Sequence, residues 1–153
     1  MTYTISNVIG SIATLLKGQY PDYNIYASAV PQGVTTPCFF ISFMPSSSKS
    51  EVDARYLNEL NLDIVFLDTP NEINITETAY GIIEFLDEYL ETFPYYDDFD
   101  EDPSGVMHSY NRQYHFEDMD LHYQLTIKAR GHFEVTSTLM TELEAITYEI
   151  KSK

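Results

Sequence analysis

The feature that most restricts the fold is a strict two-residue alternation of apolar and polar side chains in the C-terminal third of the chain. From residue 121 to residue 129 every odd position is apolar and every even position is polar or cationic. Successive side chains of a β-strand point to opposite faces of the sheet, so this pattern predicts a half-buried strand. Residues 106–116 precede it across a turn at residues 117–120, which predicts an antiparallel hairpin.

Other segments predict further strands of the same sheet. Residues 38–44 are apolar at nearly every position, as in a strand covered on both faces. In residues 60–67 apolar and polar side chains alternate as far as residue 64, and every later position is apolar. Because the run from residue 51 to residue 67 is unusually long, we expect a β-hairpin arm that extends beyond the body of the domain. Residues 24–27 predict a short strand, and the serine-rich residues 46–50 a polar turn.

Two segments have the period of amphipathic helices. The first spans residues 5–16 and is followed by Gly18 and Pro21, which are stop signals. The second spans residues 75–90 and follows a capping signature at residues 69–72, and residues 74–77 offer a second possible start. Each helix has one apolar stripe, so both are expected to lie on the sheet.

The order of these elements predicts one domain over residues 1–153. We expect an α+β fold: a mostly antiparallel (mixed) sheet, two helices packed on one face, and the long hairpin arm. Residues 30–37 and 97–103 are predicted loops, the second because like charges resist packing. Residues 139–150 permit either a short helix or an edge strand.

Charge excludes several functions. Eight Lys and Arg against 24 Asp and Glu give a formal net charge of −16, which repels phosphate and anionic membranes. Cys38 is the single cysteine, so an internal disulfide is excluded, and its apolar neighbours favour a buried thiol over a nucleophile. Residues 1–20 lack the pattern of a signal peptide, and no stretch is long and apolar enough to span a bilayer.

Two short motifs suggest chemistry without the context that it needs. Ser46 and Lys49 have the spacing of serine–lysine acyl transferases, but they lie in a predicted loop and the companion motifs are absent. Asp98, Asp100 and Asp102 have the spacing of a calcium loop, but proline and serine stand where that loop needs glycine and glutamate. We expect solvated side chains in both places.

The histidines and carboxylates do not indicate an active site either. The histidines are widely spaced and lack the paired patterns of zinc ligands, so we expect them on hairpin surfaces: His108, His115, His122 and His132. Carboxylates are too numerous for a catalytic pair to be chosen. We therefore predict no enzyme, no catalytic residue, no metal and no cofactor.

Several short motifs follow one another between the predicted elements. They are Val30-Pro31-Gln32-Gly33, Pro37-Cys38-Phe39-Phe40-Ile41, Arg55-Tyr56, Leu62-Asp63-Ile64-Val65-Phe66 and Asp120-Leu121-His122-Tyr123. With a short helix before them and a helix around residues 82–90, this arrangement resembles the small tail terminator proteins of long-tailed phages and prophages. The resemblance extends to about Arg130, and the acids of residues 97–102 and the C-terminal tail lie outside its motifs.

The resemblance implies a structural virion protein. Its copies would form a ring, typically a hexamer, on the last ring of the tail tube, stop tube growth and present a docking surface for the neck or head connector. Its partners would be further copies of the chain, the tail tube protein, a neck or head-completion protein and, where the tail has one, the sheath protein. DNA would only pass through the lumen, and no membrane is involved. The protein would reside at the tail–neck junction of the virion after assembly in the host bacterial cytoplasm.

Two sets of residues are candidates for these contacts. Arg and Tyr are favoured anchors of interfaces, so the arm supplies the candidate oligomer or tube contacts: Arg55, Tyr56, Lys49 and Glu51. An ordinary surface salt bridge and a packing tyrosine are the alternative interpretation of the first two. A candidate acidic loop would face the lumen or solvent: Asp97, Asp98, Asp100, Glu101 and Asp102.

The rival interpretation is an acidic inhibitor that binds a nuclease or toxin, either an immunity protein or a DNA mimic. A net charge of −16 would be its working feature. Such a mimic should carry carboxylates along one face at phosphate-like spacing, whereas here they are scattered and partly concentrated in loops. A small hydrolase is a third interpretation that no constellation of residues supports.

Overall fold

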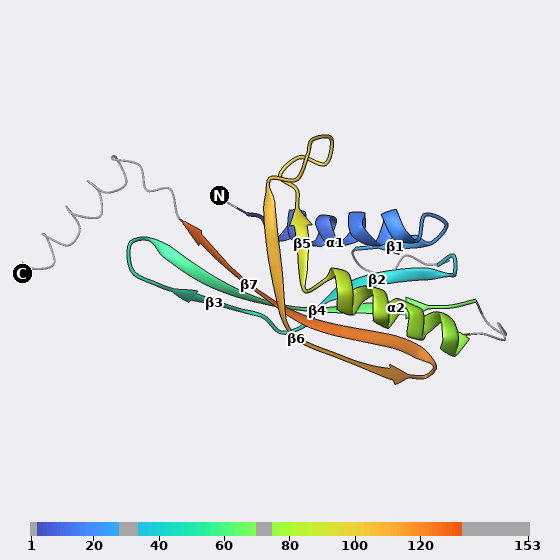
Figure 1. Ribbon diagram of the computed structural model, residues 1–153. Helices are drawn as coiled ribbons and strands as arrows, with labels where there is room; N and C mark the ends of the chain where they lie inside the picture. The colour runs from blue at the N-terminus through green and yellow to red at the C-terminus, as the bar shows by residue number, and fades with distance from the viewer. Residues whose placement is uncertain (1–2, 28–33, 70–74, 133–153) are drawn as a thin grey trace, which may run out of the picture.

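The computed structural model describes residues 3–27, 34–69 and 75–132. Within these ranges the chain forms two helices and seven strands (Figure 1): α1 (Ile5–Gln19), β1 (Asn24–Tyr26), β2 (Cys38–Phe43), β3 (Ser47–Ser50), β4 (Arg55–Leu67), α2 (Ile75–Tyr89), β5 (Thr92–Tyr95), β6 (Gly105–Glu117) and β7 (Asp120–His132). The predicted α+β class is confirmed. The predictions for residues 30–33, 70–72 and 139–150 lie outside the described residues.

The strands form one curled sheet in the order β1-β2-β4-β7-β6-β5, with β3 beside β4. Only β1 and β2 are parallel; the other described pairs are antiparallel. The long pair β4 and β7 forms its centre, in register from Arg55 opposite His132 to Phe66 opposite Leu121. The alternation in residues 121–129 therefore predicted the central strand correctly.

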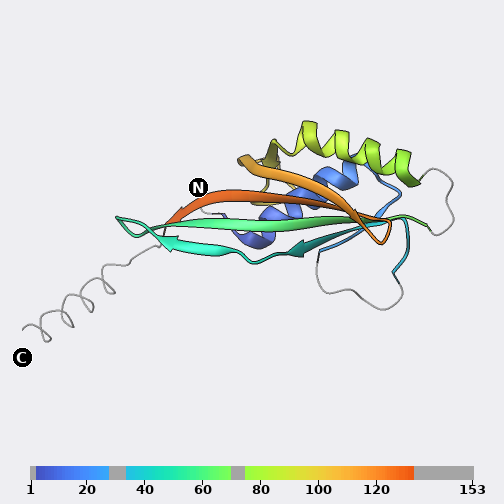
Figure 2. The same cartoon turned by 90° about the horizontal axis from the view of Figure 1, so that it is seen from below.

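Both helices lie on one face of this sheet (Figure 2). The even-numbered residues from Leu60 to Phe66 of β4 point toward the helices and are buried, and the odd-numbered residues between them are only partly covered. Helix α1 begins after Thr4, whose side chain accepts a hydrogen bond of 3.2 Å from the Asn7 amide. The period of two in the strand and the period of 3.6 in the helices thus place the apolar stripes against each other.

An aromatic cluster fills the core where α1 ends. Phe39 of β2 is fully buried, and its ring centroid lies 5.5 Å from that of Tyr20, 5.8 Å from that of Tyr23 and 5.4 Å from that of Phe66. Phe85 of α2 meets Tyr20 edge to face at 5.7 Å. These rings join both helices to the sheet, and their tilted and edge-on geometry is favourable for aromatic pairs.

Strand β6 bends and pairs with two neighbouring strands, β5 and β7. Residues 105–108 pair with β5 and residues 109–117 pair with β7, and a bulge between Tyr110 and Gln113, with Asn111 at a φ of 51°, interrupts the pairing with β7. Strand β5 in turn packs against α1. The curl of the sheet around the helices follows from this bulge.

Strands β3 and β5 were not predicted. The sequence suggested a polar turn at residues 46–50, but Ser47–Ser50 pairs with β4 although all four residues are exposed. Phe93 and Pro94, between the second predicted helix and the predicted loop at residues 97–103, also belong to a strand, β5. Proline lacks an N–H and is tolerated here because β5 is an edge strand.

The predicted arm is present. Strands β3 and β4 form a hairpin through Asp53 and Ala54, whose φ values of 61° and 57° are typical of a type I′ turn. In both ribbon views this hairpin, with the end of β7 beside it, extends beyond the two helices (Figures 1 and 2). The arm, as defined here, comprises residues 47–59 and 128–132.

Buried phenol and thiol groups predict a loss of stability in alkaline solution. Burial raises the pKa of five groups: Tyr3, Tyr20, Tyr23, Cys38 and Tyr123. Because these pKa values are higher in the folded than in the unfolded chain, their stabilising contribution is complete below the unfolded values. It is lost as pH rises through the folded values. We expect the free energy of unfolding to fall progressively above about pH 10, the ordinary pKa of tyrosine, as measured by urea unfolding.

The Tyr123→Phe variant serves as the control for this alkaline loss. Besides burial, a 2.7 Å hydrogen bond to Asp87 raises the pKa of the Tyr123 phenol. Removing the phenol should make the decline with pH less steep. A free energy of unfolding that stays constant well above pH 10 would contradict the argument.

Candidate functional site

The arm carries most of the basic side chains that the structure describes. Of the six Lys and Arg residues in the described ranges, four lie on the arm: Lys49, Arg55, Lys128 and Arg130. Three of them have acidic neighbours on the same arm: Arg55 lies 3.7 Å from Asp53, Lys128 lies 3.7 Å from Glu59, and Arg130 lies 2.9 Å from Glu51. These pairs are exposed and contribute little to stability, so the cations can exchange partners at low cost.

The structure places Tyr56 inside the arm. It lies opposite Gly131 of β7, where an added Cβ would be 2.3 Å from the Tyr56 Cζ and Oη atoms. Glycine therefore leaves the space in which the ring rests on the neighbouring strand. Tyr56 is half-buried, whereas Lys49 and Arg55 are exposed. The four candidate contact residues of the arm thus lie together at its tip. Arg55 and Lys49 are exposed, and Tyr56 and Glu51 are partly buried.

The acidic loop, residues 97–102, connects β5 to β6 and lies over the first half of α1. All of its residues are exposed, but its backbone is held: the Asn7 side chain donates to the Asp97 carbonyl at 3.0 Å, and Ser104 accepts from the Asp97 amide at 3.1 Å. An added Cβ at Gly10 would lie 2.6 Å from the Phe99 ring, so this glycine makes room for the loop. The loop is therefore an ordered acidic projection.

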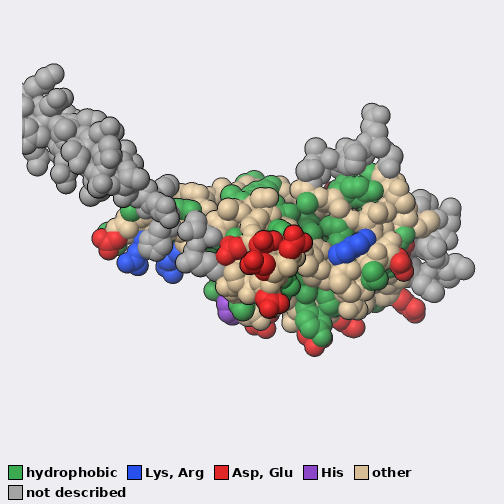
Figure 3. All heavy atoms as spheres, turned by 90° about the horizontal axis from the view of Figure 1, so that it is seen from above, with side chains coloured by type: hydrophobic (Ala, Val, Ile, Leu, Met, Phe, Trp, Pro, Cys, Tyr) green, Lys and Arg blue, Asp and Glu red, His purple; other side chains and the backbone are tan. Residues whose placement is uncertain are grey.

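Acidic side chains also gather on two surfaces away from the arm. Figure 3 shows acidic side chains gathered over the middle of the molecule, and basic and acidic side chains side by side at the end where the arm lies. A second acidic stripe runs along the solvent side of α2, where Glu77, Glu84 and Glu88 are exposed together with Tyr80. The described Lys and Arg residues are therefore concentrated on the arm, whereas these two surfaces carry exposed carboxylates.

The sheet face opposite the helices is polar at its centre. Three cross-strand contacts join β4 to β7 there: Asp63 with His122 at 2.8 Å, Asn61 with Thr126 at 2.6 Å, and Glu59 with Lys128 at 3.7 Å. We call these three contacts the polar ladder. All of its members except the exposed Lys128 are only partly exposed, so most of the pairs satisfy groups that the sheet has partly removed from water.

The histidines correct one expectation from the sequence. Their spacing suggested that no two would share a strand face, but His115 and His122 are opposite each other across the β6–β7 hairpin. Their rings stack with centroids 5.1 Å apart. The ligand atoms of His115, Glu117 and His122 all lie within 4.8 Å of one another. The predicted turn at residues 117–120 contained this signal, because it sets residues 115 and 122 opposite each other.

Residues of the serine–lysine and calcium-loop motifs form local hydrogen bonds. The Ser46 hydroxyl donates to the Met44 carbonyl at 2.9 Å and accepts from the Asn61 amide at 2.9 Å. Asp98 accepts from the Asp100 amide at 2.9 Å. In the described part of the chain, the acidic loop does not bring three ligand atoms together as the histidine cluster does. Cys38 is fully buried, as predicted, and burial raises the pKa of its thiol.

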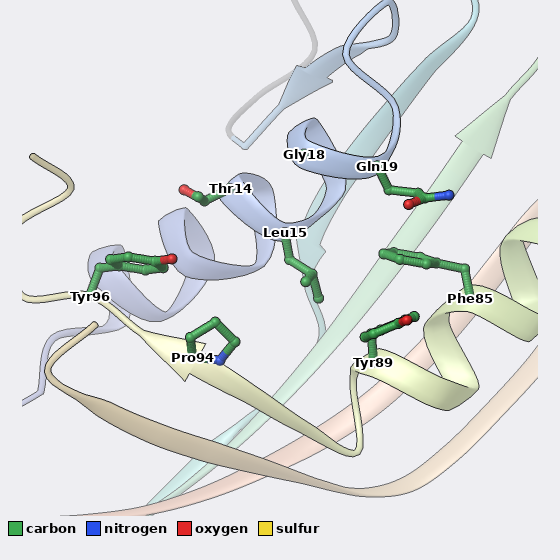
Figure 4. Close-up of a pocket in the computed structure, with 8 residues that line it drawn as sticks. All are labelled: Thr14, Leu15, Gly18, Gln19, Phe85, Tyr89, Pro94 and Tyr96. Atoms are coloured by element: carbon green, nitrogen blue, oxygen red, sulfur yellow. The ribbon is translucent and has the colours of Figure 1, made fainter. Parts of the chain in front are cut away.

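An open groove of about 470 Å³ lies between α1, α2 and β5 (Figure 4). Leu15, Phe85, Tyr89 and Pro94 give it an apolar lining, and Thr14, Gln19 and Tyr96 lie at its rim. The residues that line it include no carboxylate, amine, imidazole or thiol. The groove therefore offers mainly apolar surface, together with the hydroxyl groups of Thr14, Tyr89 and Tyr96.

Comparisons with known proteins agree with the resemblance. In the described ranges, no helix has both the length and the apolar character needed to cross a membrane. A search of curated proteins finds no match. A family model described as "Phage tail terminator protein" matches residues 7–146, a range that includes the whole sheet, α2, the acidic loop and the arm. The chain therefore belongs to the phage tail terminator family.

Proposed function

We propose that copies of this protein form a ring, hexameric as the resemblance implies, that caps the tail tube of a long-tailed phage or prophage. The ring stops tube elongation and gives the neck or head connector a surface to dock on. Family membership supports the structural tail role. The observation that supports the ring is the uneven distribution of charge: four of the six Lys and Arg residues in the described ranges lie on the arm, whereas the acidic loop and the outer face of α2 carry exposed carboxylates.

A closed ring needs two different patches on each copy that fit each other. The arm lies at one end of the molecule and α2 toward the other (Figure 1). We place the arm of one copy on the acidic stripe of the next copy's α2, where Glu77, Glu84 and Glu88 are exposed. Tyr80, 54% exposed and edge-on to Phe116, adds an aromatic anchor to that stripe.

The roles of the arm residues follow from their positions. Arg55 and Lys49 are exposed and meet the carboxylates of the neighbour, while Tyr56 and Glu51 hold the arm in shape through Gly131 and Arg130. Charge pairs that lose water at an interface contribute more than the exposed pairs of the free protein. The tail tube protein, a neck or head-completion protein and, in sheathed tails, the sheath protein contact other surfaces of the ring.

The acidic loop faces the lumen in this arrangement. Five exposed carboxylates on an ordered projection repel a passing DNA phosphate backbone. DNA is then in transit and is not held. The negative net charge also opposes association of free copies, so the finished tube acts as the template on which the ring forms.

The direct test adds the purified protein to tail tubes that lack a terminator, assembled in the host cytoplasm and isolated. We expect electron microscopy to show a ring at one end of each tube, and added tube protein to elongate capped tubes no further. Tubes that stay bare and grow at the same rate with and without the protein would disprove the proposal. A tight complex with a nuclease or toxin would favour the acidic inhibitor instead.

A further inference from the structure

The histidine cluster has the composition and arrangement of a metal site. His115 and Glu117 are two residues apart on β6, and His122 lies opposite His115 on β7, so all three side chains lie on the sheet face away from the helices. The Nε2 atoms of both histidines lie 3.9 Å from the Glu117 Oε2 atom. Three potential ligands thus surround one point near the hairpin end.

Asp63 orients one of these ligands. Its Oδ2 atom lies 2.8 Å from the His122 Nδ1 atom, and the two side chains are 14% and 19% exposed. An ionised carboxylate can only accept, so Nδ1 carries the proton and the Nε2 lone pair is left toward His115 and Glu117. Histidines that bind metals almost always donate their other ring N–H in this way, which fixes the ring and raises its basicity.

The second oxygen of Asp63 strengthens this interpretation. Its Oδ1 atom is buried and has no hydrogen-bond partner among the described residues. A buried carboxylate with one free oxygen concentrates negative charge behind His122, and this charge favours a cation on the far side of the ring.

We propose that His115, Glu117 and His122 bind a transition-metal dication, of which zinc is the best fit, with Asp63 as the positioning residue behind His122. Two imidazoles and one carboxylate form a ligand set that zinc takes, whereas calcium and magnesium prefer oxygen ligands alone. Zinc ligands at about 2.0–2.1 Å stand roughly 3.4 Å apart in a tetrahedron. Two of the three ligand-atom pairs are 3.9 Å apart and all three lie within 4.8 Å. Rotations of the His115 and Glu117 side chains, which are 48% and 67% exposed, would bring the three atoms to the shorter separation.

The fourth position opens to solvent on the sheet face. When zinc is bound, a water molecule would take this fourth position, as in zinc sites with three protein ligands. The metal would tie the ends of β6 and β7 together beside the turn at residues 117–120. The proposal is independent of the ring, because every ligand comes from one copy.

The test is a zinc titration of tag-free, chelator-treated protein by calorimetry, with excess Mg²⁺ present to occupy unspecific carboxylates. We expect one zinc per chain. His115→Asn and His122→Asn should each weaken zinc binding at least about 100-fold, and Asp63→Asn about 10–100-fold, as the loss of a carboxylate behind a ligand does. Cobalt should give visible d–d bands of a four-coordinate site that disappear in the two histidine variants.

His108→Asn is the matched control. His108 is exposed on the same strand but pairs with Thr92 of β5 and lies outside the cluster, so this variant should bind zinc as the original protein does. Circular dichroism should show all four variants folded. Equal zinc affinity in His108→Asn and the two cluster variants, or no zinc binding in the presence of Mg²⁺, would overturn the proposal.

Discussion

Replacing Arg55 with glutamate is expected to abolish ring formation on tail tubes and to leave the isolated protein folded. Within the described ranges, the Arg55 side chain forms an exposed pair with Asp53 at 3.7 Å, so its loss should change the free energy of unfolding by less than about 1 kcal/mol. At the proposed contact, a carboxylate at this position would face the carboxylates of the neighbour's α2. Like charges at an interface cost several kcal/mol. Counting capped tube ends by electron microscopy measures the effect.

Two variants separate the arm from general charge. Lys17→Glu makes the same change in net charge, but Lys17 lies on α1, where it donates to the Tyr23 carbonyl at 3.0 Å; capping should persist. Arg55→Lys keeps the charge at the arm and should retain much of the capping. If Arg55→Glu and Lys17→Glu cap tubes equally well, Arg55 has no role in the ring.

Phe39→Ala is expected to cause the largest loss of folding stability. Phe39 is fully buried between Tyr20, Tyr23 and Phe66. Its truncation leaves a cavity that these three rings cannot fill. Such substitutions cost about 3–5 kcal/mol, a large share of the roughly 5–15 kcal/mol by which proteins are stable. Urea unfolding should show the midpoint shift with an unchanged slope.

Phe43→Ala controls for the loss of an aromatic ring from the same strand. Phe43 also lies on β2 but is 50% exposed, so its truncation should change the free energy of unfolding by about 0.5 kcal/mol or less. Comparable losses in both variants would mean that the cluster around Phe39 does not anchor the fold.

Much of the fold was predictable because burial imposes periodicity. The alternation in β7 and the stripe of α2 each have one side on the core, so their patterns are legible in the sequence. Strand β3 has no such side: Ser47–Ser50 is exposed throughout and forms a strand only because β4 offers a free edge. In β5, Pro94 suggests a break, and only its place at the edge of the sheet makes it compatible with a strand.

The candidate site was less predictable because its groups meet across strands. The arm and its charges were expected from the length of the run up to Leu67, whereas the pairing of His115 with His122 depends on the register of a hairpin. The contact of His122 with Asp63 depends on β7 pairing with β4, a neighbour 59 residues away in the chain. Spacing in sequence carries no information about such a contact until the strand order is known.

The polar ladder also determines how far the arm reaches. If β4 slipped by one residue against β7, every side chain of β4 would move to the opposite face of the sheet. The carboxylates of Glu59 and Asp63 would then enter the apolar core between the sheet and the helices. The strand is therefore locked lengthwise at its middle, and each residue beyond that point adds about 3.3 Å. β4 therefore fixes the distance between its middle, where the register is set, and Arg55 at the tip of the arm.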